Sequence, residues 1–103
     1  MLEIKKTFEE TELAIKLIGR LDTTTAPNFE GELRKSINNV EKLIIDMGEL
    51  EYISSAGLRV LLSAQKVMNK QGEMIIRRAN ETIMEVFEVT GFIDILSIEE
   101  SLS

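Results

Sequence analysis

The sequence of 103 residues contains neither cysteine nor histidine. Without cysteine the chain cannot form disulfides or zinc–thiolate sites, and it has no thiol nucleophile. Without histidine it lacks the commonest general base and metal ligand at neutral pH, which excludes serine–histidine hydrolysis within this chain. We therefore expect no metal ion and no cofactor.

Aromatic residues and basic charge are also scarce. Only 5% of the residues are aromatic and none is tryptophan, which is too few for a surface that stacks nucleic-acid bases. The chain has 12 basic and 18 acidic residues, so its net charge is −6. Because nucleic acids and anionic membranes are bound through clustered lysine and arginine, we expect neither to be a partner.

Long apolar runs are missing as well, and no transmembrane helix is predicted. The first ten residues, MLEIKKTFEE, lack the apolar stretch of a signal peptide. We expect a cytoplasmic protein.

What the chain does contain is typical of one globular domain. Hydrophobic residues make up 44% and charged residues 29% of the sequence. A chain of this length buries roughly 65% of the surface that its unfolded form exposes, which is enough for a stable core without disulfides or metal ions. No linker or repeat divides it, so a single domain over residues 1–103 is predicted. Short strands alternate with helices, which indicates an α/β fold.

Two strands open the chain. Leu2 and Ile4 alternate with polar residues as in a half-exposed edge strand, and residues 13–19 form the second strand. The connection at residues 9–12 is too short for a parallel crossover. The first two strands are therefore predicted to be antiparallel.

A helix is predicted over residues 26–39, because three threonines offer N-cap oxygens and Pro27 suits a first turn. Gly31 weakens this helix by roughly 1 kcal/mol relative to alanine, and the sequence shows no neighbour that requires a glycine. The predicted buried stripe contains Phe29, Leu33, Ile37 and Val40.

Residues 42–47 form a continuous apolar run ending in an acid, which is typical of a central strand covered on both faces. A loop is predicted over residues 48–54 and a second helix over residues 55–69. The apolar residues of this helix recur at helical spacing: Leu58, Leu61, Leu62, Ala64, Val67 and Met68.

The last third of the chain predicts a strand at residues 74–76 after Gly72, which suits a left-handed helix cap. A third helix opens at Asn80 or Glu81 and closes at Gly91. A last strand at residues 93–98 and a short helix in the acidic tail follow. Together these elements predict a mixed, mostly parallel five-stranded sheet with an antiparallel first strand, flanked by three to four helices.

The most informative stretch joins the central strand to the second helix, where Ser54 and Ser55 precede the small residues Ala56 and Gly57. The start of a helix has free N–H groups and partial positive charge. Phosphorylation there would add about −1.5 to −2 charge units, while Gly57 would let another surface approach. This pattern predicts a switch. A purely structural interpretation stays open, because serine is also a leading N-cap residue.

Several segments resemble one known family. The stretch Tyr52-Ile-Ser-Ser-Ala-Gly-Leu58, between Leu43-Ile-Ile-Asp46 and Arg59-Val-Leu-Leu62, resembles the STAS domain family of bacterial anti-sigma factor antagonists. The segments Gly19-Arg-Leu-Asp22, Lys70-Gln-Gly72 and Val89-Thr-Gly-Phe92 match in place and spacing. The resemblance covers nearly the whole chain and implies a mixed sheet packed by helices.

The resemblance also implies a mechanism for a stand-alone antagonist. Its partner would be an anti-sigma factor with serine kinase activity, which binds the unphosphorylated chain and phosphorylates a serine at the start of the second helix. A PP2C-type phosphatase would reset the system. By motif position the acceptor is Ser55, with Ser54 as the second choice. Ser54 stands where many members carry aspartate, and Ala56 where many carry serine or threonine.

The expected partner surface extends beyond the serines. Asp22 would lie near the serine turn and bind a hydroxyl or repel a phosphate, or else it caps the following helix. Arg59 would pair with an acid of the partner or stay solvated. Tyr52, with Met47 and Leu50, would form a docking rim or pack the loop. The full predicted set is Asp22, Tyr52, Ser54, Ser55, Ala56, Gly57 and Arg59.

Three alternatives stay open. Asp46 stands where the phosphoacceptor of a receiver domain would lie, but the acids for a magnesium site are misplaced, and Asp46 is expected to bind the serine loop instead. Glu49 and Glu51 could suggest acid–base catalysis, yet exposed acids are usually solvated, so we expect no enzyme. STAS domains also occur in stress-signalling scaffolds and lipid-transport complexes without phospho-switching.

Overall fold

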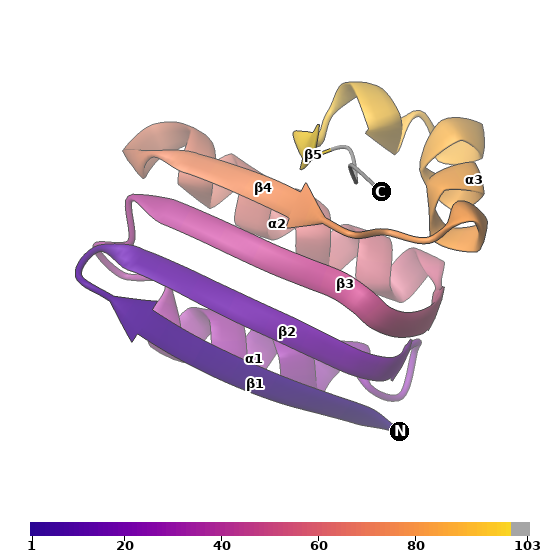
Figure 1. Ribbon diagram of the computed structural model, residues 1–103, viewed down its shortest axis with the longest axis horizontal. Helices are drawn as coiled ribbons and strands as arrows, with labels where there is room; N and C mark the ends of the chain where they lie inside the picture. The colour runs from indigo at the N-terminus through magenta and orange to yellow at the C-terminus, as the bar shows by residue number, and fades with distance from the viewer. Residues whose placement is uncertain (100–103) are drawn as a thin grey trace.

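The computed structural model describes residues 1–99, in which an opening hairpin is followed by alternating helices and strands (Figure 1). The strands are β1 (Leu2–Glu9), β2 (Glu12–Leu21), β3 (Lys42–Ile53), β4 (Glu73–Arg77) and β5 (Ile98–Glu99). The helices are α1 (Ala26–Ser36), α2 (Ser55–Gln71), α3 (Glu81–Thr90) and the 3₁₀ turn η1 (Phe92–Asp94).

The strands form one sheet in the order β1-β2-β3-β4-β5. β1 runs antiparallel to β2, and every other neighbouring pair is parallel. The crossovers that the three parallel pairs require contain α1, α2, and α3 with η1. The predicted mixed five-stranded sheet with an antiparallel first strand is therefore confirmed.

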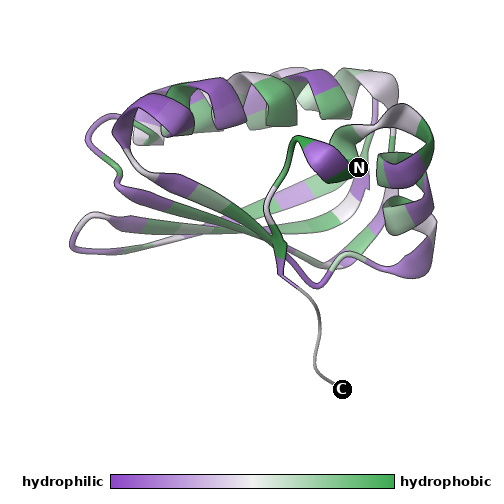
Figure 2. Cartoon of the chain, turned by 90° about the horizontal axis from the view of Figure 1, so that it is seen from above, coloured by the Kyte–Doolittle hydropathy of each residue, from purple (hydrophilic) through white to green (hydrophobic). Residues whose placement is uncertain are grey.

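The core lies between the sheet and the helices: Figure 1 shows α1 and α2 behind the sheet, and Figure 2 shows the helical layer on one side of the strands. Alternate residues of β2 point into this layer, so Leu13, Ile15 and Leu17 are fully buried. Phe29 from α1 and Leu61 from α2 close it from the other side. Most of the apolar helix positions expected from their spacing are buried, but Ile37 and Leu62 are only half-buried and Val67 is 40% exposed.

The expectation that the central strand is covered on both faces is wrong. Asp46 of β3 lies beside Lys16 of β2 and Arg77 of β4, and all three keep part of their surface in solvent. The face away from the helices is therefore a charged surface, although Ile44 at its centre is shielded to 5% exposure.

Two element boundaries differ from the prediction near the serine turn. The predicted loop at residues 48–54 is strand as far as Ile53, and β2 continues to Leu21 instead of ending at Gly19. Register shifts fall between Lys16 and Ile18 and between Gly19 and Arg20, which breaks the two-residue alternation of a regular strand. These irregular pairings hide the strand from a periodicity argument.

Other predicted features also need correction. The first helix ends at Ser36 rather than at residue 39. Gly72 has φ 171°, which is extended and not left-handed; its smallness is needed because a Cβ there would collide with the Glu41 carbonyl. Gly91, at φ 81°, does close α3 in the left-handed conformation as predicted.

The end of the described chain departs most from the prediction. Of the strand expected over residues 93–98, only Ile98 lies in β5, and residues 92–94 form η1 instead. The helix expected in the acidic tail falls mainly on residues 100–103, outside the described residues. None of the helices within residues 1–99 is long and apolar enough to cross a bilayer.

Candidate functional site

The candidate site lies at the edge of the sheet where the parallel strands β2 and β3 both end. Leu21 is paired with Ile53, so Asp22 and Ser54 leave the sheet side by side. The Ser54 N–H donates to the Leu21 carbonyl at 2.9 Å and ties the two ends together. Asp22 thus lies near the serine turn, as the family resemblance implied.

The two serines differ sharply in their access to solvent. Ser54 is the N-cap of α2, with an extended backbone, and its carbonyl accepts from Leu58 N at 3.0 Å. Its hydroxyl makes no capping bond, and its Oγ is buried without a hydrogen-bond partner among the described residues. Ser55, the first residue of the helix, is exposed. Of the two hydroxyls, that of Ser55 is the one that another protein can reach.

The charge along α2 leaves its beginning electropositive. The helix contains Arg59, Lys66 and Lys70 and no acidic residue, although the whole chain carries a net charge of −6. Its first turn therefore has no carboxylate that would compensate the positive end of the helix dipole. A phosphate on Ser55 would be stabilised at this position.

Gly57 has no room for a side chain because it packs against other residues of this chain. It is buried, and a Cβ at this position would lie 2.7 Å from Leu21 Cγ and 3.0 Å from Ile53 Cγ1. We predicted that Gly57 lacks a side chain so that another protein can approach; the structure shows instead that its small size is required by packing inside this chain. The missing side chain lets α2 start directly against the ends of β2 and β3.

Asp22 organises its own turn. Its Oδ1 accepts hydrogen bonds from the amides of Thr24, at 3.0 Å, and Thr25, at 3.1 Å. The bond from the Thr25 amide is the main reason that the pKa of Asp22 lies below its ordinary value. No hydrogen bond joins Asp22 to either serine within residues 1–99. Asp22 therefore holds the turn that precedes α1, whose N-cap is Thr25, and it binds neither serine hydroxyl nor the first amides of the helix itself.

The rim predicted from Met47, Leu50 and Tyr52 contains only the tyrosine at the surface. Met47 and Leu50 are buried in the core, whereas Tyr52 is 38% exposed. The Arg20 guanidinium lies 4.4 Å from the centroid of the Tyr52 ring, because the two residues are paired across β2 and β3. Arg20 was missed as a site residue, since its partner is distant in sequence and only the strand register brings them together.

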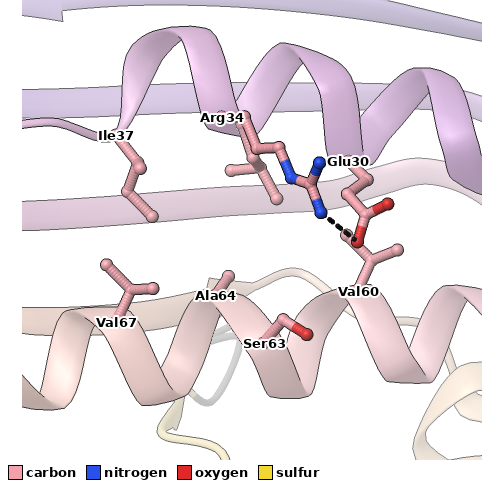
Figure 3. Close-up of a pocket in the computed structure, with 8 residues that line it drawn as sticks. Glu30, Arg34, Ile37, Val60, Ser63, Ala64 and Val67 are labelled. Atoms are coloured by element: carbon pink, nitrogen blue, oxygen red, sulfur yellow. Dashed lines mark ion pairs between the residues drawn. The ribbon is translucent and has the colours of Figure 1, made fainter.

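Ala56 and Arg59 border a groove between α1 and α2. Near Ser55 the groove has a volume of about 320 Å³. It continues along the helices past Val60 and Ala64 to Val67, over a further volume of about 250 Å³ (Figure 3). The exposed surface beside Ser55 therefore extends along the side of α2.

The acids weighed as alternatives are held by basic side chains. Arg78 donates to Asp46 at 2.7 and 3.0 Å, and Asp46 accepts from Gly48 N at 2.9 Å. Partial burial alone would raise the pKa of Asp46, but these bonds outweigh it and lower that pKa. Asp46 therefore binds the first residue of the predicted loop and not the serines.

Glu49 is bound by Lys16, whose hydrogen bond lowers the pKa of that carboxyl. A general acid at neutral pH needs a raised pKa, so this carboxyl is poorly suited to that role. Its neighbour Glu51 is exposed.

Comparison with known proteins gives a consistent result. The sequence model of the STAS domain family matches residues 3–103 of this chain. The relative BtrV of Bordetella bronchiseptica is 38% identical over 87 residues, which cover 82% of this chain and 75% of BtrV. The anti-sigma-B factor antagonist of Listeria monocytogenes is 30% identical over 100 residues, covering 95% of this chain and 87% of the relative.

Solved structures share the fold at low sequence identity. An anti-sigma factor antagonist from Mycobacterium paratuberculosis superposes with a TM-score of 0.89 at 17% identity, covering 99% of this chain and 88% of that one. The Bacillus cell fate determinant SpoIIAA, solved in its phosphorylated form, gives a TM-score of 0.73 at 17% identity, covering 98% and 93%.

Proposed function

The chain belongs to the STAS domain family, and we propose that it is an anti-sigma factor antagonist switched by phosphorylation of Ser55. The unmodified chain binds an anti-sigma factor in the cytoplasm and so frees a sigma factor. That anti-sigma factor is also a serine kinase, which transfers the γ-phosphoryl group of ATP to Ser55 Oγ and thereby ends the interaction. A PP2C-type phosphatase removes the phosphate.

The proposal rests mainly on the exposure of Ser55 at the first position of α2. The names of the relatives support an antagonist, and a phosphorylated structure with the same fold supports the switch. Tyr52, Ala56 and Arg59 lie within four residues of Ser55 in the sequence and form the proposed contact surface. Ser54 contributes its backbone to the turn, because its buried hydroxyl cannot reach a kinase without rearrangement.

Electrostatics explains how one phosphate could reverse the binding. The bare surface around Ser55 carries the positive charge of Arg59, with the carboxylates of Asp22 and Glu30 nearby. A phosphoserine adds about −1.5 to −2 charge units and three acceptor oxygens. Arg59 stands four residues later, on the same face of the helix, where it can pair with that phosphate. The modification therefore adds bulk and negative charge and withdraws the arginine from an acidic group of the partner.

The test is phosphoryl transfer from candidate anti-sigma kinases of the source genome with ATP, followed by phosphopeptide mapping. We expect phosphate on Ser55 in the unmodified chain, none in Ser55→Ala, and undiminished transfer to Ser54→Ala as the matched control. Transfer that survives in Ser55→Ala would refute the assignment. Partner binding without any transfer would instead support the alternative of a STAS module without a phospho-switch.

A further inference from the structure

The outer edge of β1 is a regular strand edge with nothing paired to it in the described part of the chain. β1 pairs with β2 through eight consecutive residues without a register shift, and it contains no proline. Arg20 N donates to Met1 O at 3.0 Å. Because hydrogen-bonded pairs alternate along an antiparallel ladder, the N–H and C=O groups of Leu2, Ile4, Lys6 and Phe8 point away from β2. This edge can accept another strand.

Lysines on an edge strand usually prevent it from pairing with another chain, but both lysines of β1 form ion pairs within this chain. Lys6 Nζ lies 2.7 Å from Glu32 Oε1 and donates to Ser36 Oγ at 3.0 Å, so α1 holds its charge. Lys5 lies on the opposite face of the sheet with Glu3, their charged atoms 3.7 Å apart. Of the four charged residues of β1, only Glu9 at its end forms no ion pair among the described residues.

We propose that this edge pairs antiparallel with the same edge of a second copy, with Ile4 opposite Ile4 of that copy. In this register each Lys5 faces Glu3 of the other copy, and the outward groups of Leu2, Ile4 and Lys6 are all paired. Registers centred on Glu3, Lys5 or Lys6 would place like charges directly opposite each other, which destabilises cross-strand pairs. A register centred on Thr7 pairs fewer of the outward groups.

The groove beneath this edge provides a second, independent observation. Between β1 and α1 lies an open space of about 530 Å³, bordered by Leu2, Ile4, Gly31 and Glu32. Gly31 stands in the middle of α1, yet a Cβ there would meet nothing within 4 Å. No contact within the described chain therefore explains a residue that weakens the helix. In the dimer both α1 helices flank the seam, and Gly31 leaves room for side chains of the other copy.

The dimer is independent of the proposed phospho-switch and leaves the serine site open. β1 is one edge of the sheet, whereas α2 lies behind β3 and β4 (Figure 1). Two-fold dimers of this kind are the commonest oligomers of identical chains. Each assembly would present two Ser55 surfaces.

Sedimentation equilibrium of the purified full chain tests the dimer. We expect Glu3→Lys and Lys5→Glu each to raise the dimer dissociation constant by about tenfold or more, and the double exchange to restore it. Glu88→Lys on α3 makes the same charge change far from β1 and should leave dimerisation unaltered. A monomer at all concentrations would overturn the proposal, and so would a double variant that stays as weak as the single ones.

Disulfide cross-linking tests the register, because the chain has no cysteine of its own and a single introduced cysteine can react only with its copy in the other chain. Residues opposite each other in a hydrogen-bonded pair lie about 5.5 Å apart between Cα atoms, which a disulfide spans. Oxidation should therefore link Ile4→Cys into dimers but not Thr7→Cys. Cross-linking of Thr7→Cys alone would contradict the Ile4 register, and circular dichroism verifies that both variants are folded.

Discussion

On the inner side of the β3–α2 turn, Gly57 and Ile53 pack against Leu21 without free space, whereas on its outer side Ser55 and Arg59 contact solvent. The inner residues fix where α2 begins. The outer residues make no contact on which that geometry depends. A rigid backbone therefore presents a free hydroxyl, and changes on the two sides should affect different properties: stability on the inside and partner binding on the outside.

The largest loss of stability is expected inside the core, beneath the helix that carries the site. Leu61 is fully buried between α2 and the sheet, so Leu61→Ala should lower the free energy of unfolding by about 2–5 kcal/mol. Val67→Ala on the same helix is the control, because Val67 is 40% exposed and its truncation should cost much less. Urea denaturation measures both. Equal losses would mean that the two helix faces were misassigned.

A smaller loss is expected on the inner side of the turn itself. Gly57→Ala places a methyl group 2.7 Å from Leu21 Cγ and should cost about 1–3 kcal/mol through overpacking. Gly31→Ala is the matched control when both variants are measured as monomers, since that site is open within one chain and alanine should strengthen α1 by about 1 kcal/mol. If both substitutions stabilise the chain in chemical denaturation, the inner side of the turn is not tightly packed.

Charges on the outer surfaces should appear in the pH dependence of stability. The pKa values of Asp22, Glu32, Asp46 and Glu49 lie below their ordinary values of 3.8 for aspartate and 4.5 for glutamate. The unfolded chain therefore binds more protons than the folded chain in acid, and stability is lost as the pH falls through these values. We expect the urea midpoint to be level above about pH 5 and to fall below about pH 4.5. A midpoint that rises on acidification would contradict these shifts.

The smallest changes in stability are expected at the two serines. Ser54→Ala removes a buried hydroxyl that lacks a partner in the described chain, so stability should stay equal or rise by less than about 1 kcal/mol. Ser55→Ala changes an exposed side chain and should stay within about 0.5 kcal/mol. Thermal unfolding compares the two. A large loss in Ser55→Ala would place its hydroxyl in a structural role.

Much of this architecture could be predicted from sequence because apolar spacing and short connections are local signals. The spacing of Phe29 and Leu33 predicted one buried helix face, and the short link between the first two strands predicted their direction. The extension of β3 to Ile53 could not be predicted, because irregular pairing with β2 creates it. Likewise, Ile93 alternates with Ile95 as in a strand, but the turn after Gly91 places both in or beside η1.

The site, like the fold, was predicted only where its signals are local in the sequence. Motif order pointed to the start of α2 and to Asp22 beside it. The burial of the Ser54 hydroxyl, the packing of Gly57 on Leu21 and the stacking of Arg20 on Tyr52 all depend on strand register. That register is a property of the folded sheet and leaves no pattern in a single sequence.

The most direct test of the switch is isothermal titration of the anti-sigma partner with unmodified chain, Ser55→Asp and Ser55→Ala, each first shown to be folded. We predict that Ser55→Ala binds as tightly as the unmodified chain. Ser55→Asp should bind at least about tenfold more weakly, a loss of about 1.4 kcal/mol. Unchanged affinity of Ser55→Asp, in a chain that the partner does bind, would contradict the assignment of Ser55 as the switch.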